Sequence, residues 1–239
     1  MTLQKLKIEL QRHANPEKAK IYARFFKTGK GEYGEGDVFL GLTVPQTRGI
    51  SKNYGHLNLD EIHDLLTSPI HEHRLISLLI LIHKYGKSDD HGKNKFIDFY
   101  LKNAKKVNNW DLVDLSAHQL LGEYLLQKNK ARSILEKLAK SSNVWEKRIS
   151  IISTYVFIKK YKFDETLKIA GLLLNDKHDL IQKAVGWMLR EVGKHISREV
   201  EELFLKKYYL QMPRTSLRYA IEHFPQDLRI AYLRGAIGE

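Results

Sequence analysis

A tryptophan and two carboxylates, Trp110, Asp111 and Asp114, stand close together in the middle of the chain. Trp110 and Asp114 are four residues apart, so in a helix they share one face. An ionised carboxylate can stabilise positive charge that develops in a transition state, and the face of an indole attracts cations. In the structural alternative, Trp110 packs in the core while Asp111 and Asp114 interact with a positive helix N-terminus. The spacing leaves both interpretations open.

A second aromatic and basic group lies further along the chain. Trp187 and Arg190 are three residues apart, and Lys183 comes one turn earlier, so the three can share a helical face. Arg148 follows Trp145 near the start of a helix expected between the two groups. The alternative is again structural, with the tryptophan in the core and the cations in solvent.

The sequence indicates neither thiol nor metal chemistry. The chain has no cysteine, which excludes disulfides, thiolate nucleophiles and cysteine-bound zinc. Six histidines lie between residues 56 and 91, but no pair has the i, i+4 spacing with an intervening glutamate that a helical zinc site needs. We expect surface or packing roles for these histidines, no metal and no cofactor.

Glycines concentrate in residues 28–42. Residues 29–34 (GKGEYG) formally match the fingerprint of dinucleotide-binding proteins, but they follow a helical run and lead to no strand and crossover helix. A glycine-rich loop or a short β-hairpin inserted between two early helices explains them better. Glu32, Glu35 and Asp37 in this insert would repel phosphate.

The charge of the chain favours a polyanionic partner. Lys and Arg number 40 against 28 Asp and Glu, a formal net charge of +12. Basic side chains that approach nucleic acid release condensed counterions, although an indifferent basic surface is the alternative. Pro213 suits the first turn of a helix that carries Arg214 and Arg218 on one face, where they would extend a phosphate-binding track. Residues 1–13 resemble neither a signal peptide nor a membrane span, so we expect a cytoplasmic protein with no membrane partner.

Helical periodicity runs through most of the chain, and no strand-like alternation of any length follows residue 45. Residues 70–87 align without gaps on residues 177–194, and further helix starts are expected near Asn109 and Val144. This spacing is typical of HEAT-like arrays, although four ordinary amphipathic helices of similar composition are the alternative. The sequence predicts an all-α fold, an α-α superhelix of HEAT-like or ARM-type repeats forming a single domain over residues 1–239. Basic residues distant in sequence would then line one concave groove.

Four segments give the chain a resemblance to a known family. They are residues 15–19 (NPEKA), 110–114 (WDLVD), 143–148 (NVWEKR) and 181–191 (IQKAVGWMLRE). On these segments the sequence resembles the AlkD-type DNA alkylation repair proteins, which are HEAT-like superhelices. The resemblance implies a monofunctional DNA glycosylase of base excision repair. Such an enzyme hydrolyses the N-glycosidic bond of cationic N3- and N7-alkylated purines in double-stranded DNA. We further expect a monomer.

The resemblance also implies residue roles. Asp114, Trp110 and Trp187 would be catalytic, and Arg148, Arg190 and Arg48 would contact the DNA backbone. We expect further DNA contacts from Phe25, Lys183, Arg214 and Arg218. The carboxylate of Asp114 would stabilise an electron-poor deoxyribose and orient the attacking water. The lesion would be detected through the backbone on an open concave face.

Two departures from the AlkD pattern indicate an alternative function. Phe25 stands where active relatives have a tyrosine, so it keeps the ring and loses the hydroxyl. Residues 28–37 are absent from the shorter AlkD pattern and resemble the hairpin of related branches, some of which bind unusual DNA structures without excising bases. A non-catalytic binder of branched or distorted DNA is therefore the alternative. A protein-interaction scaffold is a third hypothesis, which leaves the basic excess unexplained.

Overall fold

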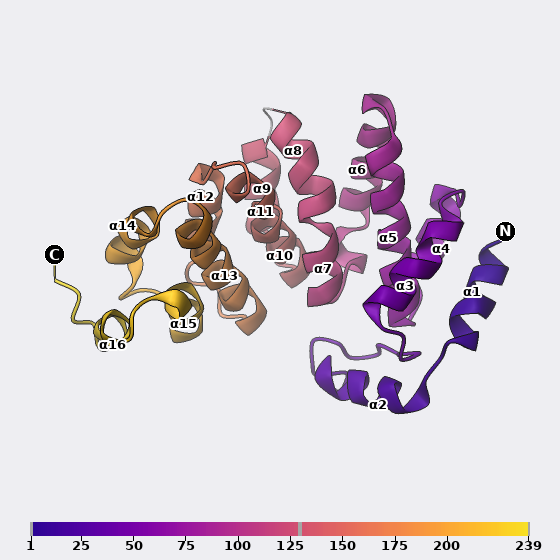
Figure 1. Ribbon diagram of the computed structural model, residues 1–239, viewed down its shortest axis with the longest axis horizontal. Coiled ribbons are helices and arrows are strands. Elements are labelled where there is room, and N and C mark those ends of the chain that lie inside the picture. Colours follow the sequence, from indigo (N-terminus) through magenta and orange to yellow (C-terminus); the bar gives the residue numbers. More distant parts are fainter. Residues whose placement is uncertain (1, 129–130, 239) are drawn as a thin grey trace. The chain divides into compact units, whose positions relative to one another are not determined.

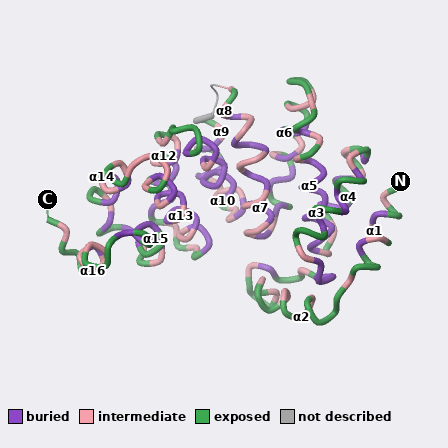
Figure 2. Tube along the Cα trace, in the orientation of Figure 1, coloured by how far each residue is buried: buried purple, intermediate pink, exposed green. Residues whose placement is uncertain are grey.

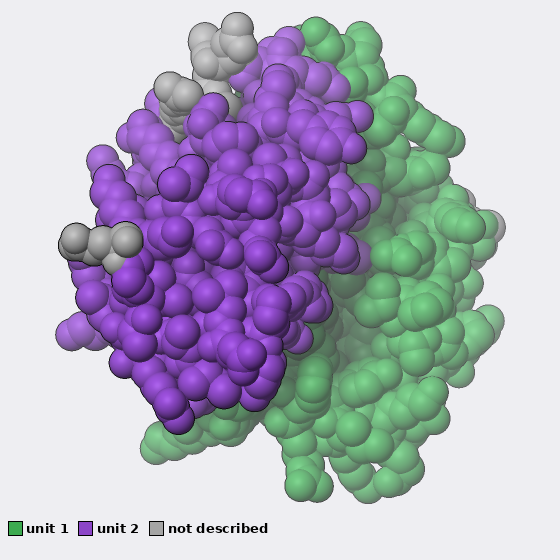
Figure 3. Space-filling model, turned by 60° about the vertical axis from the view of Figure 1, so that its left-hand side comes forward, with its two compact units in different colours: residues 1–112 green, residues 113–239 purple. Residues whose placement is uncertain are grey.

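The computed structural model describes residues 2–128 and 131–238, which fold mainly into helices (Figure 1). These residues contain no strand, and their one β-type contact is an isolated parallel bridge between Val38 and Ile70. The predicted all-α class is confirmed. The residues form two compact units, Met1–Leu112 and Val113–Glu239, which Figure 3 shows in two colours. Within the described ranges, no helix is long and apolar enough to cross a membrane.

In the first unit, shorter helices pack around the long helix α5 (His71–Lys87). Helices α3, α4 and α6 contact α5, and helix α7 begins at the end of this unit and continues into the second. The other elements are α1 (Leu3–Arg12), α2 (Pro16–Phe25), α3 (Val44–Ser51), η1 (Lys52–Tyr54), α4 (Leu59–Leu66), α6 (Asp90–Lys102), η2 (Ala104–Lys106) and α7 (Trp110–Ser116). Their apolar faces form a core whose fully buried members include Leu6, Leu10, Leu57, Ile62, Leu65, Ile76 and Ile80.

Helix α2 differs from its neighbours because none of its residues is buried (Figure 2). It starts at Pro16, and the side chain of Asn15 caps it by accepting a 3.0 Å hydrogen bond from the backbone N–H of Lys18. Ile21 and Phe25 are 61 % and 62 % exposed. The first unit therefore presents two large apolar side chains to solvent from one helix.

The second unit is organised around another long helix, α13 (Asp179–His195), which packs against α10, α12, α14 and α15. The remaining elements are η3 (His118–Gly122), α8 (Glu123–Gln127), α9 (Ala131–Ala139), α10 (Val144–Ile152), α11 (Tyr155–Ile158), α12 (Asp164–Leu172), α14 (Arg198–Tyr208), α15 (Arg214–Ala220), η4 (Ile221–His223) and α16 (Gln226–Arg234). Gly186 lets α15 approach α13 closely, because a Cβ atom at this position would lie 2.3 Å from the carbonyl oxygen of Ser216.

The expected repeat positions agree with the helices. Helices α5 and α13, which contain the two aligned segments, are each 17 residues long. The starts expected near Asn109 and Val144 correspond to α7 at Trp110 and α10 at Val144. Periodicity and turn residues were therefore sufficient to place these helices.

The glycine-rich insert is a loop and not a hairpin. We call residues 28–37 the glycine loop. Its acidic side chains bind its own backbone: Glu32 accepts from the N–H of Gly29 at 2.8 Å, and Glu35 accepts from the N–H of Gly31 at 2.9 Å. No strand follows the loop within the described residues, which agrees with the rejection of a dinucleotide site. Beyond the loop, Gly41 has φ of 88°, and a Cβ there would lie 2.2 Å from the carbonyl oxygen of Asn15.

Candidate functional site

Asp114 on α7 and Arg148 on α10 form a two-pronged ion pair. Arg148 Nε donates to Asp114 Oδ1 at 2.9 Å, and its Nη2 donates to Oδ2 at 2.8 Å. Arg148 Nη1 donates to the carbonyl oxygen of Leu180 on α13. Planar guanidinium–carboxylate pairs of this kind fix the orientation of both side chains and are stronger than hydrogen bonds between neutral groups. The Asp114 carboxylate is thus held in one direction by a neighbouring helix while its side chain keeps 18 % of its surface exposed.

Local sequence explains where Arg148 sits. Asn143 caps α10 by accepting from the backbone N–H groups of Trp145 and Glu146, and Arg148 follows one turn later. Trp145 and Arg148 are both buried, with Arg148 only 5 % exposed. The contact of Arg148 with the DNA backbone stays a prediction. Its observed contacts are with Asp114 and Leu180.

Trp187, on α13, is half-buried and held by polar and aromatic neighbours. Its Nε1–H donates to Glu191 Oε1 at 3.1 Å, and its ring lies 6.4 Å from that of Tyr155. Glu191 also faces His195, with 3.1 Å between Oε2 and Nε2. Sequence reasoning missed Tyr155 and Glu191. The glutamate has the i, i+4 spacing from Trp187 that could have found it.

The predicted cations of the second unit differ in their surroundings. Lys183 pairs with Asp179 at 2.7 Å, and Arg190 pairs with Glu222 on η4. Arg214 and Arg218 on α15 are exposed. The DNA contacts of these four residues stay predictions.

In the first unit, Trp110 lies in an aromatic cluster. Its ring stacks on Phe26, with centroids 5.2 Å apart and planes at 19°, and Phe25 meets it edge-on at 5.9 Å. Phe26 in turn stacks on Phe39 at 5.1 Å. Of the predicted residues, the structure thus brings Phe25 and Trp110 together in this unit, while Arg48 is exposed in the last turn of α3. Phe26 and Phe39 were not predicted from the sequence.

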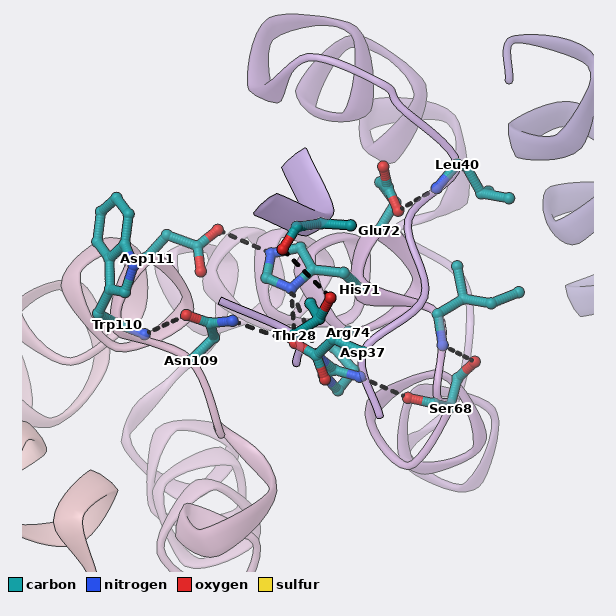
Figure 4. Close-up of polar contacts among 12 residues, drawn as sticks. Thr28, Asp37, Leu40, Ser68, His71, Glu72, Arg74, Asn109, Trp110 and Asp111 are labelled. Atoms are coloured by element: carbon teal, nitrogen blue, oxygen red, sulfur yellow. Dashed lines mark hydrogen bonds and ion pairs between the residues drawn. The ribbon is translucent and has the colours of Figure 1, made fainter. Parts of the chain in front are cut away.

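A buried ionic network adjoins these rings (Figure 4). His71 Nε2 lies 2.8 Å from Asp111 Oδ2, and Asp37 Oδ2 lies 2.6 Å from Arg74 Nη2 and 3.4 Å from His71 Nδ1. Asn109 donates a 3.1 Å hydrogen bond to Asp37 and accepts one from the N–H of Trp110. The network therefore connects the end of the glycine loop to the start of α7.

The network holds a charged imidazole. Burial disfavours the cation, but the Asp111 carboxylate and the hydrogen bonds to Asp111 and Asp37 outweigh it and raise the pKa of His71 to about 9. Burial likewise disfavours ionised Asp37, but His71, Arg74 and Asn109 lower the pKa of Asp37 below its ordinary value. Asp111 and Asp114 therefore have side-chain cations as partners. In the structural alternative both carboxylates interact with a helix N-terminus, and Asp111 does lie in the first turn of α7.

Helix α7 links the two groups in sequence, because it carries Trp110 and Asp114 four residues apart. Trp110 belongs to the first unit and Asp114 to the second. Within the second unit, Arg148 joins Asp114 to α13, the helix that carries Lys183, Trp187 and Arg190. No cluster of three or more histidines and acidic residues that could hold a metal occurs in the described parts of the chain.

Comparison with solved structures shows the fold. The chain is similar to a predicted DNA alkylation repair enzyme from Enterococcus faecalis, with a TM-score of 0.70 and 18 % sequence identity over 89 % of this chain and 97 % of that one. The expected helical-repeat fold class is confirmed. No curated protein matches the sequence.

Family comparison covers nearly the whole chain. The model of the family described as DNA alkylation repair enzyme matches residues 6–224. This match confirms the resemblance found in the sequence motifs, and it supports a role in DNA repair with DNA as the partner. The chain belongs to the DNA alkylation repair enzyme family.

Proposed function

We propose that the chain is a monofunctional DNA glycosylase that hydrolyses the N-glycosidic bond of cationic N3- or N7-alkylated purines in double-stranded DNA. The observation that carries this proposal is the Asp114 carboxylate, held by two hydrogen bonds from buried Arg148 yet still part-exposed. Family membership supplies the substrate, DNA, and the chemistry of the site supplies the reaction.

The reaction needs little from the protein because the alkylated purine is already a good leaving group. As the bond from C1′ to the base nitrogen breaks, its electron pair neutralises the cationic ring and the base leaves. Water then attacks C1′ and releases its proton to solvent. The Asp114 carboxylate stabilises the electron-poor sugar and accepts a hydrogen bond from the water. Arg148 donates one hydrogen bond to each oxygen and thereby fixes the direction in which the carboxylate points.

The other predicted residues act on the lesion and the strand. Trp110 and Trp187 offer electron-rich faces to the cationic base and sugar, worth about 0.5–2 kcal/mol each. The stacking of Trp110 on Phe26 and the hydrogen bond from Trp187 to Glu191 support such roles by fixing the rings. Phosphate groups are bound by the basic residues Arg48, Lys183, Arg190, Arg214 and Arg218.

Release of bases from alkylated DNA tests the proposal. The wild-type protein should release 3-methyladenine or 7-methylguanine, and Asp114→Asn should slow release at least about a hundredfold. Asp98→Asn, at an exposed position on α6, is the matched control and should release bases at the wild-type rate. Circular dichroism checks that Asp114→Asn still folds without its partner for Arg148. If wild-type release does not exceed that of Asp114→Asn, the glycosylase proposal fails.

The glycine loop favours a second candidate, a non-catalytic binder of branched or distorted DNA. The loop is anchored at Asp37, so the whole of residues 28–37 cannot be deleted without disturbing the buried network. Replacing residues 29–36 by a short linker while keeping Asp37 avoids this problem. This candidate requires the shortened protein to lose a preference for four-way junctions over linear duplex. An unchanged preference would exclude the loop as the junction-binding element.

A further inference from the structure

The second unit contains a cavity of about 390 Å³ between the end of α13, the start of α14 and η4, within the size range of small-molecule sites. Ala220 and Phe224, both buried, form an apolar wall. Four basic residues also line the cavity: Arg190, Lys194, Arg198 and His223. We call this cavity the basic pocket. Apart from Arg190, none of its lining residues has a role in the function proposed above.

One acid, Glu201 on α14, lines the basic pocket and is only 2 % exposed. Its carboxyl group lies directly on α13, where a Cβ atom at Gly193 would overlap Oε2. Its Oε1 is buried and has no hydrogen-bond partner within the described residues. Burial, with a smaller contribution from Glu202, raises the pKa of Glu201 to about 9. Glu201 is therefore a neutral carboxylic acid at neutral pH, with an O–H group to donate.

A second unused donor lies in the wall of the basic pocket. Arg190 Nε is buried and has no hydrogen-bond partner among the residues that the structure describes, while Nη1 of the same side chain pairs with Glu222. Lys194 is exposed beside it on α13. A buried donor without an acceptor is costly, so an oxyanion that accepts from both Glu201 and Arg190 would gain stability.

The number of donors favours a phosphate monoester as this oxyanion. A carboxylate has two oxygens, and a phosphodiester within a strand has two terminal oxygens. A monoester has three terminal oxygens and carries nearly two negative charges at neutral pH. Glu201, Arg190 and Lys194 can therefore supply one donor to each oxygen. The volume of the basic pocket exceeds that of one phosphate, which leaves room for a substituent against Phe224.

We propose that the basic pocket binds a phosphate monoester, such as a nucleotide, whose phosphate accepts hydrogen bonds from Glu201 and Arg190 and whose substituent lies against Phe224. The inference goes beyond the proposed function, which assigns to Arg190 a phosphodiester of an intact strand. Two sources share this chemistry: a free mononucleotide, and the 5′-phosphorylated end of a DNA strand.

Calorimetric titration with deoxyadenosine 5′-monophosphate in phosphate-free buffer tests the ligand class. Deoxyadenosine, which lacks the phosphate, should bind at least about tenfold more weakly. Glu201→Gln keeps an N–H donor at the same place and should bind the nucleotide like the wild type. Glu201→Leu removes the donor and should weaken binding about 10- to 100-fold. Circular dichroism checks that the leucine variant folds.

Glu199→Leu is the matched control, because Glu199 is an exposed acid two residues earlier on α14 and lies outside the basic pocket. This variant should bind the nucleotide at least as tightly as the wild type. The proposal is overturned if the nucleotide does not bind, or if the nucleoside binds equally well. Binding that Glu201→Leu leaves unchanged, or that both leucine variants weaken equally, overturns it as well.

The pH dependence of binding identifies the proton donor. As the pH rises through about 9, Glu201 ionises and repels the phosphate, so the affinity of the wild type should fall. Glu201→Gln should keep its affinity over the same interval. The other charged groups around Glu201 are the same in both proteins: Arg190, Lys194, Arg198, Glu202, Glu222 and His223. Burial raises the pKa of Tyr232 to about 12, so this residue ionises only above the interval. A parallel fall in both proteins would refute Glu201 as the donor.

Competition with short DNA duplexes distinguishes the two sources. If a duplex with 5′-phosphates displaces the nucleotide and the same duplex with 5′-hydroxyl ends does not, the ligand is the end of a strand. If neither duplex displaces the nucleotide, the basic pocket takes the free mononucleotide. Equal displacement by both duplexes would place an internal phosphodiester in the basic pocket and overturn the assignment of a monoester.

Discussion

His71 on α5 and Asp111 on α7 form a buried ion pair, with 2.8 Å between Nε2 and Oδ2, although 40 residues separate them in the sequence. The second ring nitrogen of His71 faces Asp37, at the end of the glycine loop. One imidazolium therefore fixes the loop and the helix that starts with Trp110. Its protonation should be visible in the stability of the protein.

We expect the free energy of unfolding to fall as the pH rises from about 6.5 to about 9, the interval between the ordinary pKa of histidine and the raised pKa of His71. In this interval the native state holds a proton that the unfolded state releases. The stabilisation is complete below the interval and lost above it, by an amount on the order of 3 kcal/mol. Urea unfolding at pH values across the interval measures this dependence.

Two variants show which residue causes the change of unfolding free energy with pH. Burial also raises the pKa of Glu201 to about 9, which adds a loss of stability with rising pH that begins at lower pH. His71→Gln should reduce the loss of unfolding free energy with rising pH above about pH 6.5. Glu201→Gln should remove the loss of unfolding free energy that starts below this pH. An unchanged slope in His71→Gln would show that His71 is neutral in the native protein.

Gly186→Ala should destabilise the second unit by about 1–3 kcal/mol, a typical cost of overpacking. The added methyl group would meet the backbone oxygen of Ser216, which cannot move without shifting α15. Gly171→Ala on α12 is the control, because nothing lies within 4 Å of its added Cβ atom. That change should be neutral or slightly stabilising. Thermal unfolding of the two variants checks the difference, and equal midpoints would refute the close approach.

Arg148→Lys tests whether Arg148 acts as a positioning residue for Asp114. A lysine keeps the charge but cannot make two parallel hydrogen bonds to the carboxylate. We expect the single-turnover rate of base release to fall at least about tenfold, while the salt dependence of DNA binding stays the same. Arg48→Ala, at an exposed position, should instead reduce the salt slope, the slope of log affinity for DNA against log salt concentration, by about 1. Arg148→Gln removes the charge and tests the other role, because a salt slope reduced by about 1 in this variant would mean that Arg148 contacts phosphate.

Arg218→Ala should weaken binding to all DNA sequences alike and reduce the salt slope by about 1, if this exposed residue of α15 touches phosphate. Arg12→Ala, at an exposed position in the last turn of α1, provides the comparison. Fluorescence anisotropy with a labelled duplex at several salt concentrations gives both slopes. Identical slopes for Arg218→Ala and the wild type would leave Arg218 as an ordinary solvated cation.

The sequence predicted local features well and tertiary partners poorly. The starts of α7 and α10 followed from periodicity and from turn residues such as Asn143, because both depend on neighbours in the chain. The pairing of Arg148 with Asp114 spans 34 residues and depends on how helices pack, which periodicity does not record. The glycine loop was predicted only in part. Its position followed from the sequence, but positive φ at Gly31 and Gly36 is compatible with either a hairpin or a loop.

The three hydrogen bonds that Glu72 accepts from Leu40, Gly41 and Leu42 have a practical consequence for protein engineering. They clamp the chain just after the glycine loop to α5, independently of what the loop tip contains. A Cβ atom added at Gly31 or Gly36 would meet no other atom within 4 Å, although the positive φ of both residues favours keeping glycine itself. A dye attached to the exposed side chain of Lys30 would therefore leave this clamp intact, whereas Gly34 must be kept, because a Cβ atom there would lie 2.4 Å from the carbonyl oxygen of Phe26.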